Sequence, residues 1–321
     1  MATLLLLAQG ASLPDADRAY AAGRYAEAAG EYRRLLESAP GEPGLLLRLA
    51  AAEYQLGDYA AAERHFRGVL EKAEAPPALV GLGTTLLMLG RFDEAIPPLE
   101  RALELTPEDV QVRRALGRAY AEEGMFVEGE ATLSKLLEED PSDWQSWYFL
   151  GALFFDQNYH QPALDALEKS LALHPDNPTA HVYRAGSLSQ LGRADEAEQA
   201  FNELARDPRL ADSTERLLGH AQLLFRTERY DQALQLINRA VEVDPHSAKL
   251  RFWKARLLYH SGEIKAALAE AEQAVALSPE TPNARNLLLK LYRVLGREEE
   301  AAQQAAWLRK YENRIALGKP R

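Results

Sequence analysis

Apolar residues recur along the chain at the spacing of one face of an α-helix. One example is the stretch from residue 147 to 154, where apolar or small residues stand three or four positions apart: Trp147, Leu150, Gly151 and Phe154. Such segments come in pairs, separated by a residue that tolerates the left-handed conformation in which helices end. These turn residues are Gly23, Gly57, Gly90, Gly124, Asn158, Gly192, Gly262 and Gly296. The pattern predicts a series of helical hairpins.

The hairpins repeat at a fixed period. Gly90 and Gly124 are 34 residues apart, and Pro107 and Pro141 are separated by the same distance. Each second helix carries a small residue where two helix axes are expected to approach closely: Ala28, Ala62, Ala95, Gly129, Ala163, Ala197, Ala233, Ala267 and Ala301. Most units then stop at a proline, which cannot continue the hydrogen-bond ladder: Pro40, Pro107, Pro141, Pro175, Pro208, Pro245 and Pro279.

This pattern resembles the tetratricopeptide repeat family, in which Trp, Leu-Gly, Tyr, Gly-x-Tyr, Ala, Phe, Ala and Pro stand at set offsets. The unit 110–143 matches at Leu116, Gly117, Tyr120, Gly124, Phe126 and Pro141, and the unit 144–177 at Trp147, Leu150, Gly151, Ala163 and Pro175. Residues 9–315 hold nine such units, starting near 9, 43, 76, 110, 144, 178, 214, 248 and 282. The resemblance implies an all-α fold, a right-handed α-solenoid (superhelix) of helix-turn-helix hairpins.

Some units depart from the period. The second unit is one residue short, and the sixth has two extra residues around 209–213, which predict a longer connection. Pro97 and Pro98 fall near the start of a second helix, where we expect at most a kink. The first unit carries Asp15, Ala16 and Asp17 at positions that should be apolar, so we expect a cap or a half-formed hairpin there.

Charge and composition narrow the class of partner. The formal net charge of −11 argues against nucleic-acid binding, which needs a basic surface. The absence of cysteine excludes disulfides, thiolate nucleophiles and most structural zinc sites. Residues 1–8 are either a signal-like segment or a disordered terminus, so both cytoplasmic and periplasmic locations fit. The remaining chain has no apolar stretch long enough to span a membrane, and residues 316–321 form a basic tail.

We find no motif for catalysis, a cofactor or a metal. No pair of histidines stands four residues apart on one helix, and no glycine-rich phosphate loop or nucleophile elbow occurs. His174 and His181 are close in sequence, but we interpret them as two exposed histidines rather than as metal ligands. We therefore expect a protein that is not an enzyme.

The resemblance also implies a binding groove, whose wall comes from positions 2, 5, 9, 12 and 13 of each unit. The early units place small or apolar groups there: Leu47, Ala51, Val80, Thr84 and Leu87. Later units place cations, aromatics and an amide there, and these are our candidate peptide-binding residues: Arg114, Arg118, Tyr148, Phe155, Lys249, Phe252, Arg256, Tyr259, Asn286, Lys290 and Arg293. The alternative is that these side chains belong to solvated helix faces and pair with nearby glutamates.

Cationic side chains are concentrated at the C-terminal end. From residue 282 onward there are nine Lys or Arg against four Glu, in an otherwise acidic chain. The sequence thus favours a scaffold that holds other proteins or extended peptides, with a groove suited to acidic ones. A self-assembling solenoid and an accessory subunit of an enzyme complex are the alternatives, and we expect a monomer or weak dimer.

Overall fold

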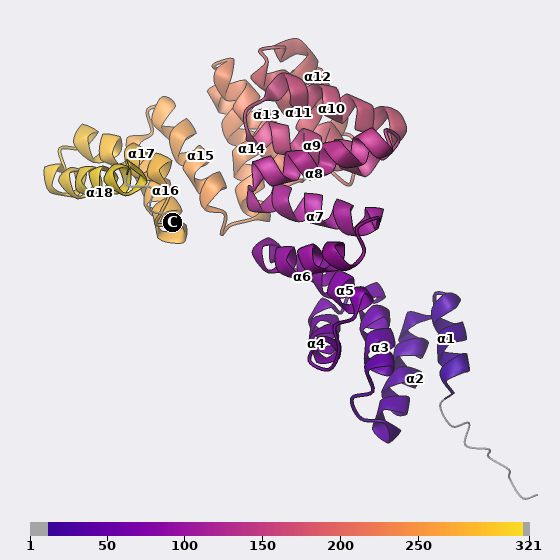
Figure 1. The fold of residues 1–321 in the computed structure, drawn as a ribbon. Helices are drawn as coiled ribbons and strands as arrows, with labels where there is room; N and C mark the ends of the chain where they lie inside the picture. Colours follow the sequence, from indigo (N-terminus) through magenta and orange to yellow (C-terminus); the bar gives the residue numbers. More distant parts are fainter. Residues whose placement is uncertain (1–11, 317–321) are drawn as a thin grey trace, which may run out of the picture. The chain divides into compact units, whose positions relative to one another are not determined.

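The structure is a computed structural model that describes residues 12–316 (Figure 1). The chain divides into two compact units, residues 1–175 and 176–321. The described part of the first unit contains ten helices: α1 (Leu13–Ala21), α2 (Tyr25–Ser38), α3 (Pro43–Gln55), α4 (Tyr59–Leu70), α5 (Pro76–Met88), α6 (Phe92–Leu105), α7 (Val110–Glu123), α8 (Phe126–Glu139), α9 (Trp144–Asp156) and α10 (His160–Leu173).

The described part of the second unit contains eight helices: α11 (Pro178–Gln190), α12 (Ala194–Leu204), α13 (Thr214–Arg226), α14 (Tyr230–Val243), α15 (Ala248–His260), α16 (Ile264–Leu277), α17 (Pro282–Val294) and α18 (Glu298–Ala316). Each odd-numbered helix packs against the even-numbered helix that follows it. The all-α solenoid of helical hairpins predicted from the sequence is therefore confirmed. The signal-like segment at 1–8 and the end of the basic tail lie outside the described residues.

The hairpin turns have the predicted backbone conformation. All seven predicted turn glycines and Asn158 have positive φ, between 63° and 80°. The turn of the seventh hairpin, between α13 and α14, was not recognised from the sequence. It holds Glu228, which has φ of 59°. Because Glu228 precedes Gly262 by 34 residues, the repeat period alone could have located it.

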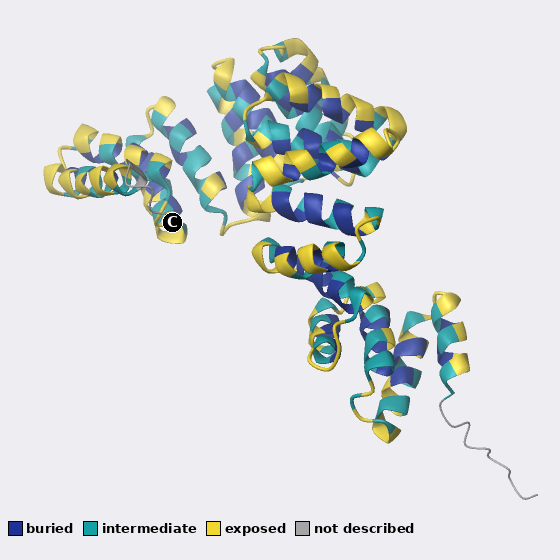
Figure 2. Cartoon of the chain, in the orientation of Figure 1, coloured by how far each residue is buried: buried dark blue, intermediate teal, exposed yellow. Residues whose placement is uncertain are grey.

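Small residues allow the two helices of a hairpin to approach each other. A Cβ added to Gly117 of α7 would lie 2.7 Å from Leu133 of α8, and one added to Gly151 of α9 would lie 2.7 Å from Leu167 of α10. On the second helices, the predicted contact residues are all buried; Ala163, for example, has no exposed surface. The buried positions form a stripe along each helix (Figure 2).

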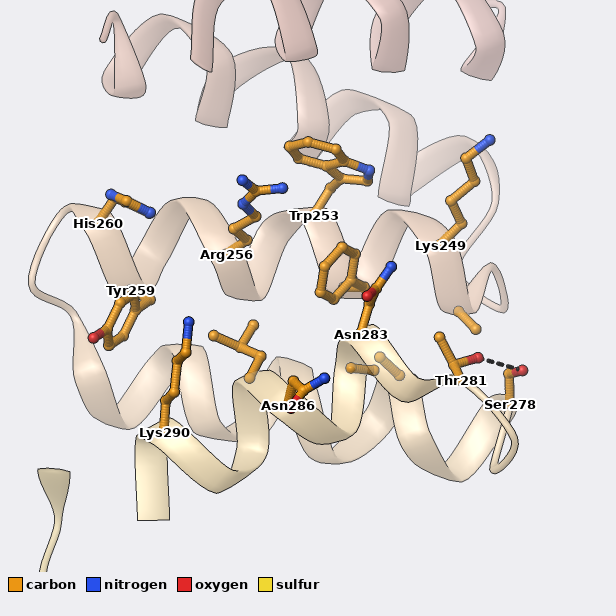
Figure 3. A pocket seen from close by; sticks show the side chains of 15 residues that line it. Lys249, Trp253, Arg256, Tyr259, His260, Ser278, Thr281, Asn283, Asn286 and Lys290 are labelled. Atoms are coloured by element: carbon orange, nitrogen blue, oxygen red, sulfur yellow. Dashed lines mark hydrogen bonds between the residues drawn. The ribbon is translucent and has the colours of Figure 1, made fainter. Parts of the chain in front are cut away.

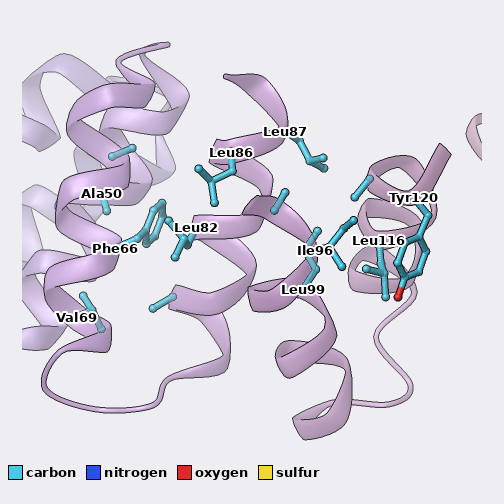
Figure 4. Packing of buried hydrophobic residues seen from close by; sticks show 14 residues of the cluster. Ala50, Phe66, Val69, Leu82, Leu86, Leu87, Ile96, Leu99, Leu116 and Tyr120 are labelled. Atoms are coloured by element: carbon cyan, nitrogen blue, oxygen red, sulfur yellow. The ribbon is translucent and has the colours of Figure 1, made fainter. Parts of the chain in front are cut away.

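Buried side chains form several clusters within the first unit. Figure 4 shows one cluster of buried side chains, in which Phe66 of α4, Leu82 and Leu86 of α5, and Leu99 of α6 pack together. Burying leucine and phenylalanine side chains stabilises the fold by roughly 1.5–3 kcal/mol each. Pro97 and Pro98 do not interrupt α6, which runs continuously from Phe92 to Leu105.

A recurring hydrogen bond ties four of the later hairpins to the link before them. The third or fourth residue of the first helix donates a side-chain N–H to the backbone carbonyl six residues earlier. The bonds are Trp147 to Pro141 at 2.9 Å, Arg216 to Leu210 at 2.9 Å, Arg251 to Pro245 at 3.1 Å, and Arg285 to Pro279 at 2.8 Å. We call this bond the link clasp. It satisfies a carbonyl at the boundary between hairpins.

The units that depart from the 34-residue period still form helical hairpins. The two extra residues of the sixth unit lie in the connection between α12 and α13, as predicted, and buried Arg216 also donates to the carbonyl of Ala211 at 2.8 Å. The first hairpin is shorter than the others but formed. Its helix α1 buries Ala16 and Ala19. The expectation that Ala16 is out of place there was therefore wrong, because a small side chain is what the contact with the next helix requires.

Candidate functional site

The first helices of neighbouring hairpins line a pocket of about 810 Å³ in the second unit. We call it the basic-aromatic pocket, and its walls come from α15, α17 and the link between α16 and α17. Six of the candidate residues lie together in its lining: Lys249, Phe252, Arg256, Tyr259, Asn286 and Lys290. Figure 3 shows the side chain of Lys290 extending from α17 toward α15, with Asn286 beside it.

Helical periodicity brings these side chains to one face. Lys249, Phe252, Arg256 and Tyr259 are three or four residues apart on α15, and Asn286 and Lys290 are four apart on α17. Residues at these spacings lie on one side of an α-helix. The two faces therefore meet across the pocket.

The pocket also contains residues that the sequence did not single out. They are Trp253, His260, Ser278, Thr281 and Asn283. Asn283 and His260 occupy groove positions 2 and 13 of their units, so the repeat numbering could have identified both. Trp253 does not occupy one of those positions, and only the structure shows that its ring borders the pocket. Thr281 donates a hydrogen bond to Ser278, 2.8 Å away, at the pocket's edge (Figure 3).

The pocket is cationic. Lys249, Arg256 and Lys290 line it, whereas none of its lining residues, all of them described, is Asp or Glu. Within the described chain, none of the three cations forms an ion pair. Instead, the guanidinium of Arg256 lies 4.4 Å from the ring centre of Phe225 and 4.8 Å from that of Trp253. Burial lowers the pKa of Arg256. An anionic group entering the pocket would thus meet positive charge without having to displace a carboxylate.

The remaining candidate of the second unit, Arg293, is exposed near the end of α17 and does not line the pocket. The structure therefore separates it from the six residues that come together.

The four candidates of the first unit lie on α7 and α9. Arg114 donates to Asp143 at 2.8 Å and to Gln111 at 2.8 Å, so its guanidinium connects two hairpins. Arg118 lies 5.8 Å from the ring centre of Phe149. Burial raises the pKa of Tyr148 to about 12, and the charge of Glu122 acts in the same direction. Phe155 is half-buried. Of the four, Arg114 is the one with a clear structural role.

The first unit has a pocket of a different kind, with a volume of about 710 Å³. We call it the apolar pocket. Most of its lining comes from α1, α3 and α5, and it contains four of the five residues predicted as an apolar groove: Leu47, Ala51, Val80 and Thr84. The fifth, Leu87, is buried in the core. The two acidic residues of the apolar pocket already have hydrogen-bond partners. Asp17 accepts from Tyr32 at 2.6 Å and from Arg48 at 3.1 Å, and Asp109 caps α7.

Residues 12–316 hold neither a candidate metal site nor a candidate membrane span. That part of the chain contains no cluster of three or more His, Cys, Asp or Glu side chains arranged to hold a metal ion. His174 stacks on Trp144, with the ring centres 4.3 Å apart. None of the helices described there is both long enough and apolar enough to cross a membrane.

Three tetratricopeptide repeat models match the chain, at residues 42–108, 86–153, 154–213, 218–279 and 261–314. Among curated proteins, the chain is similar to the DnaJ homolog subfamily C member 3 of Mus musculus, with 25% identity over 204 residues. That match covers 60% of this chain and 40% of the mouse protein. The chain spans less than half the length of the first curated relatives that it matches.

Two solved structures are similar in fold. A tetratricopeptide repeat protein from Parabacteroides merdae superposes with a TM-score of 0.63 at 21% identity, covering 78% of this chain and 98% of that one. A thermophilic repeat protein of Thermus thermophilus, TTC0263, gives a TM-score of 0.50 at 26% identity, covering 58% of this chain and all of that one. Together with the 34-residue period and the eighteen helices of the described region, these matches show that the chain belongs to the tetratricopeptide repeat family.

Proposed function

We propose that the protein is a non-catalytic scaffold that holds an extended acidic peptide segment of a partner protein in the basic-aromatic pocket. Tetratricopeptide repeat proteins generally mediate protein or peptide binding. The observation that carries the finer proposal is the pocket's composition: three cations and three aromatic rings in its lining, without a carboxylate among these described residues. This occurs in a chain whose net charge is −11.

The physical chemistry favours an acidic ligand. Charge-assisted hydrogen bonds are roughly twice as strong as neutral ones, and partly desolvated cations gain more from an incoming anion than exposed ones do. The aromatic side chains Phe252, Trp253 and Tyr259 add contact area at a low cost in conformational entropy. The amides of Asn283 and Asn286 can donate to and accept from a peptide backbone. An extended acidic peptide presents a partner for each of these groups: carboxylates for the cations, side-chain surface for the rings and backbone amides for the asparagines.

Self-assembly by end-to-end stacking receives less support. The outer face of α18 exposes charged and polar side chains: Glu298, Glu299, Gln303, Arg309, Lys310, Glu312 and Asn313. A face of this kind suits a capping helix, which ends a repeat array in solvent. The protein is therefore proposed to act as a monomer or weak dimer.

Selection from a library of random displayed dodecapeptides tests the proposal. The wild-type chain should enrich peptides rich in Asp and Glu. A variant with Lys249→Glu, Arg256→Glu and Lys290→Glu should lose that enrichment. The matched control carries Arg293→Glu, Arg309→Glu and Lys310→Glu, which change the net charge equally at exposed sites outside the pocket. Equal enrichment by both triple variants, or no acidic enrichment by the wild type, would refute the proposal.

A further inference from the structure

Three other buried or half-buried arginines of the second unit, Arg216, Arg251 and Arg285, have oxygen acceptors, whereas Arg256 has none among the described residues. Arg251 pairs with Glu270 at 2.8 Å, Arg285 donates to Gln304 at 2.9 Å, and Arg216 donates to two backbone carbonyls. Among the described residues, no hydrogen bond or ion pair to the Arg256 side chain is found, although Arg251 and Lys254 of the same helix both pair with Glu270. Because the Arg256 side chain is half-buried and lines the pocket, its N–H groups are open to an acceptor that enters there.

Two aromatic rings hold this guanidinium in place. Its central carbon lies 4.4 Å from the ring centre of Phe225, on α13, and 4.8 Å from that of Trp253, on α15. The two ring centres are 5.7 Å apart, with ring planes at 79°. Contacts of this kind combine electrostatic attraction to the ring with stacking, and arginine makes them more often than lysine.

The rings are themselves braced by neighbours. Phe225 packs edge-on against Tyr230, with centres 5.4 Å apart, and against His260, with centres 4.9 Å apart. Tyr230 stacks on His260 at 5.2 Å. Aromatic side chains of three helices, α13, α14 and α15, therefore form a clamp around Arg256, and rotation of one ring would disturb the others. A braced clamp restricts the guanidinium before any ligand arrives, which reduces the entropy lost on binding.

From this arrangement we propose that Arg256 is the specificity-determining residue of the basic-aromatic pocket, and that it recognises a carboxylate through two parallel hydrogen bonds. The inference rests on the proposed function and names the chemical group that the pocket recognises. Both rings lie on one side of the guanidinium, since their centres are only 5.7 Å apart, so the N–H groups on its other side are left for a ligand. A carboxylate is planar and can lie in the plane of the guanidinium. A tetrahedral phosphate can also accept two such bonds, but its remaining oxygens leave that plane, and one on the side of the rings would meet their negative electrostatic potential.

The two lysines of the pocket have a less directional role. The side chains of Lys249 and Lys290 are exposed, and an ammonium on a flexible four-carbon stem acts as a point charge rather than as a planar fork. They attract an acidic segment to the pocket, whereas Arg256 selects the geometry of one carboxylate within it. That carboxylate can be an Asp or Glu side chain or the C-terminus of the ligand.

The test uses a peptide selected by the wild-type chain, resynthesised with a fluorescent label, and fluorescence anisotropy to measure Kd. Arg256→Lys keeps the charge but loses the fork, so we expect binding to weaken by about tenfold or more. Arg293→Lys makes the same exchange outside the pocket and should leave Kd unchanged. Changing each acidic residue of the peptide to its amide, and amidating its C-terminus, should reveal one carboxylate whose loss weakens wild-type binding by a similar factor.

The two changes should also be coupled. With Arg256→Gln, neutralising that same carboxylate should have little further effect, as expected when two groups interact directly. If the effects of the two changes simply multiply, the proposal is wrong. Tighter binding when phosphoserine replaces the acidic residue would also overturn it. The peptide changes are made against the wild-type chain, so a poorly folded variant cannot hide the result. Failure of the wild type to select any peptide would instead refute the proposed function, and the inference with it.

Discussion

The apolar pocket and the basic-aromatic pocket occupy equivalent positions on the same kind of hairpin, yet their chemistry differs. Where the second unit places Phe252 and Arg256, at positions 5 and 9 of a first helix, the first unit places Leu47 and Ala51. The positions that pack helix against helix are alike in both units, as the buried Ala62 and Ala267 show. The comparison teaches that the repeat fixes the scaffold through one set of positions and leaves another set free to vary in chemistry.

Lowering the pH should produce the largest difference in stability between the two units. His220 of α13 is buried and stacks on Phe201, and neither of its ring nitrogens has a hydrogen-bond partner among the described residues. Burial lowers its pKa to about 4, and the charge of Arg216 adds to this, while Glu198 acts in the opposite direction. The unfolded chain binds a proton near pH 6.5, so the stability contributed by neutral His220 is lost as pH falls from about 6.5 toward 4.

We therefore expect the second unit to lose about 2–3 kcal/mol of unfolding free energy between pH 7 and pH 4.5 through this one group. Urea denaturation followed by circular dichroism at both pH values would measure the loss. His220→Leu removes the titrating group and should be less sensitive to acid than the wild type. If the two proteins lose the same stability on acidification, His220 is not the cause.

A change at a packing position should affect the scaffold rather than the pockets. Ala163 of α10 has no exposed surface and sits where the helices approach closely. Ala163→Leu should overpack this contact and destabilise the first unit by about 1–3 kcal/mol, while the peptide affinity of the basic-aromatic pocket stays unchanged. Thermal melting and anisotropy would check both parts. Ala60→Leu, on an exposed position of α4, is the control, and equal melting temperatures for the two variants would contradict the expectation.

The smallest expected effect concerns the one hairpin turn that lacks glycine or asparagine within the described chain. Glu228 has φ of 59°, a conformation that costs a residue with a Cβ roughly 1–2 kcal/mol. Since glycine also loses more entropy on folding, Glu228→Gly should stabilise the second unit by about 0.5–1 kcal/mol. Gly262→Glu, the reverse exchange one period later, should destabilise it. A Glu228→Gly variant that unfolds at a lower urea concentration than the wild type would refute this.

The sequence was sufficient to predict the scaffold because the packing rules are local and repeated. Gly124 and Asn158 could be assigned as turn residues from their position and type alone, and the structure confirms both. The same holds for Gly151, whose replacement by a larger residue would collide with Leu167. The role of each such residue depends on neighbours within the same hairpin. The equivalent position in every other unit provides a check on the assignment.

The candidate site was less predictable because its side chains depend on residues distant in the sequence. Arg114 occupies groove position 5, as Phe252 does, but its guanidinium donates a hydrogen bond to Asp143, 29 residues later. Arg256 could not be distinguished from Arg293 until the structure showed the rings of Phe225 and Trp253 around it. Whether a cation on a helix face is already paired or still available depends on side-chain directions, which the spacing of residues does not specify.

The link clasp has a consequence for how such a chain can change in length. Its donor and acceptor are six residues apart at the start of one hairpin, so a duplicated 34-residue stretch would copy both partners at once. A new hairpin would arrive with its junction already specified, and Trp147 and Arg251 show that more than one side chain can form it. Repeat arrays of this kind can therefore lengthen by copying genetic segments, without having to invent a new contact at each added boundary.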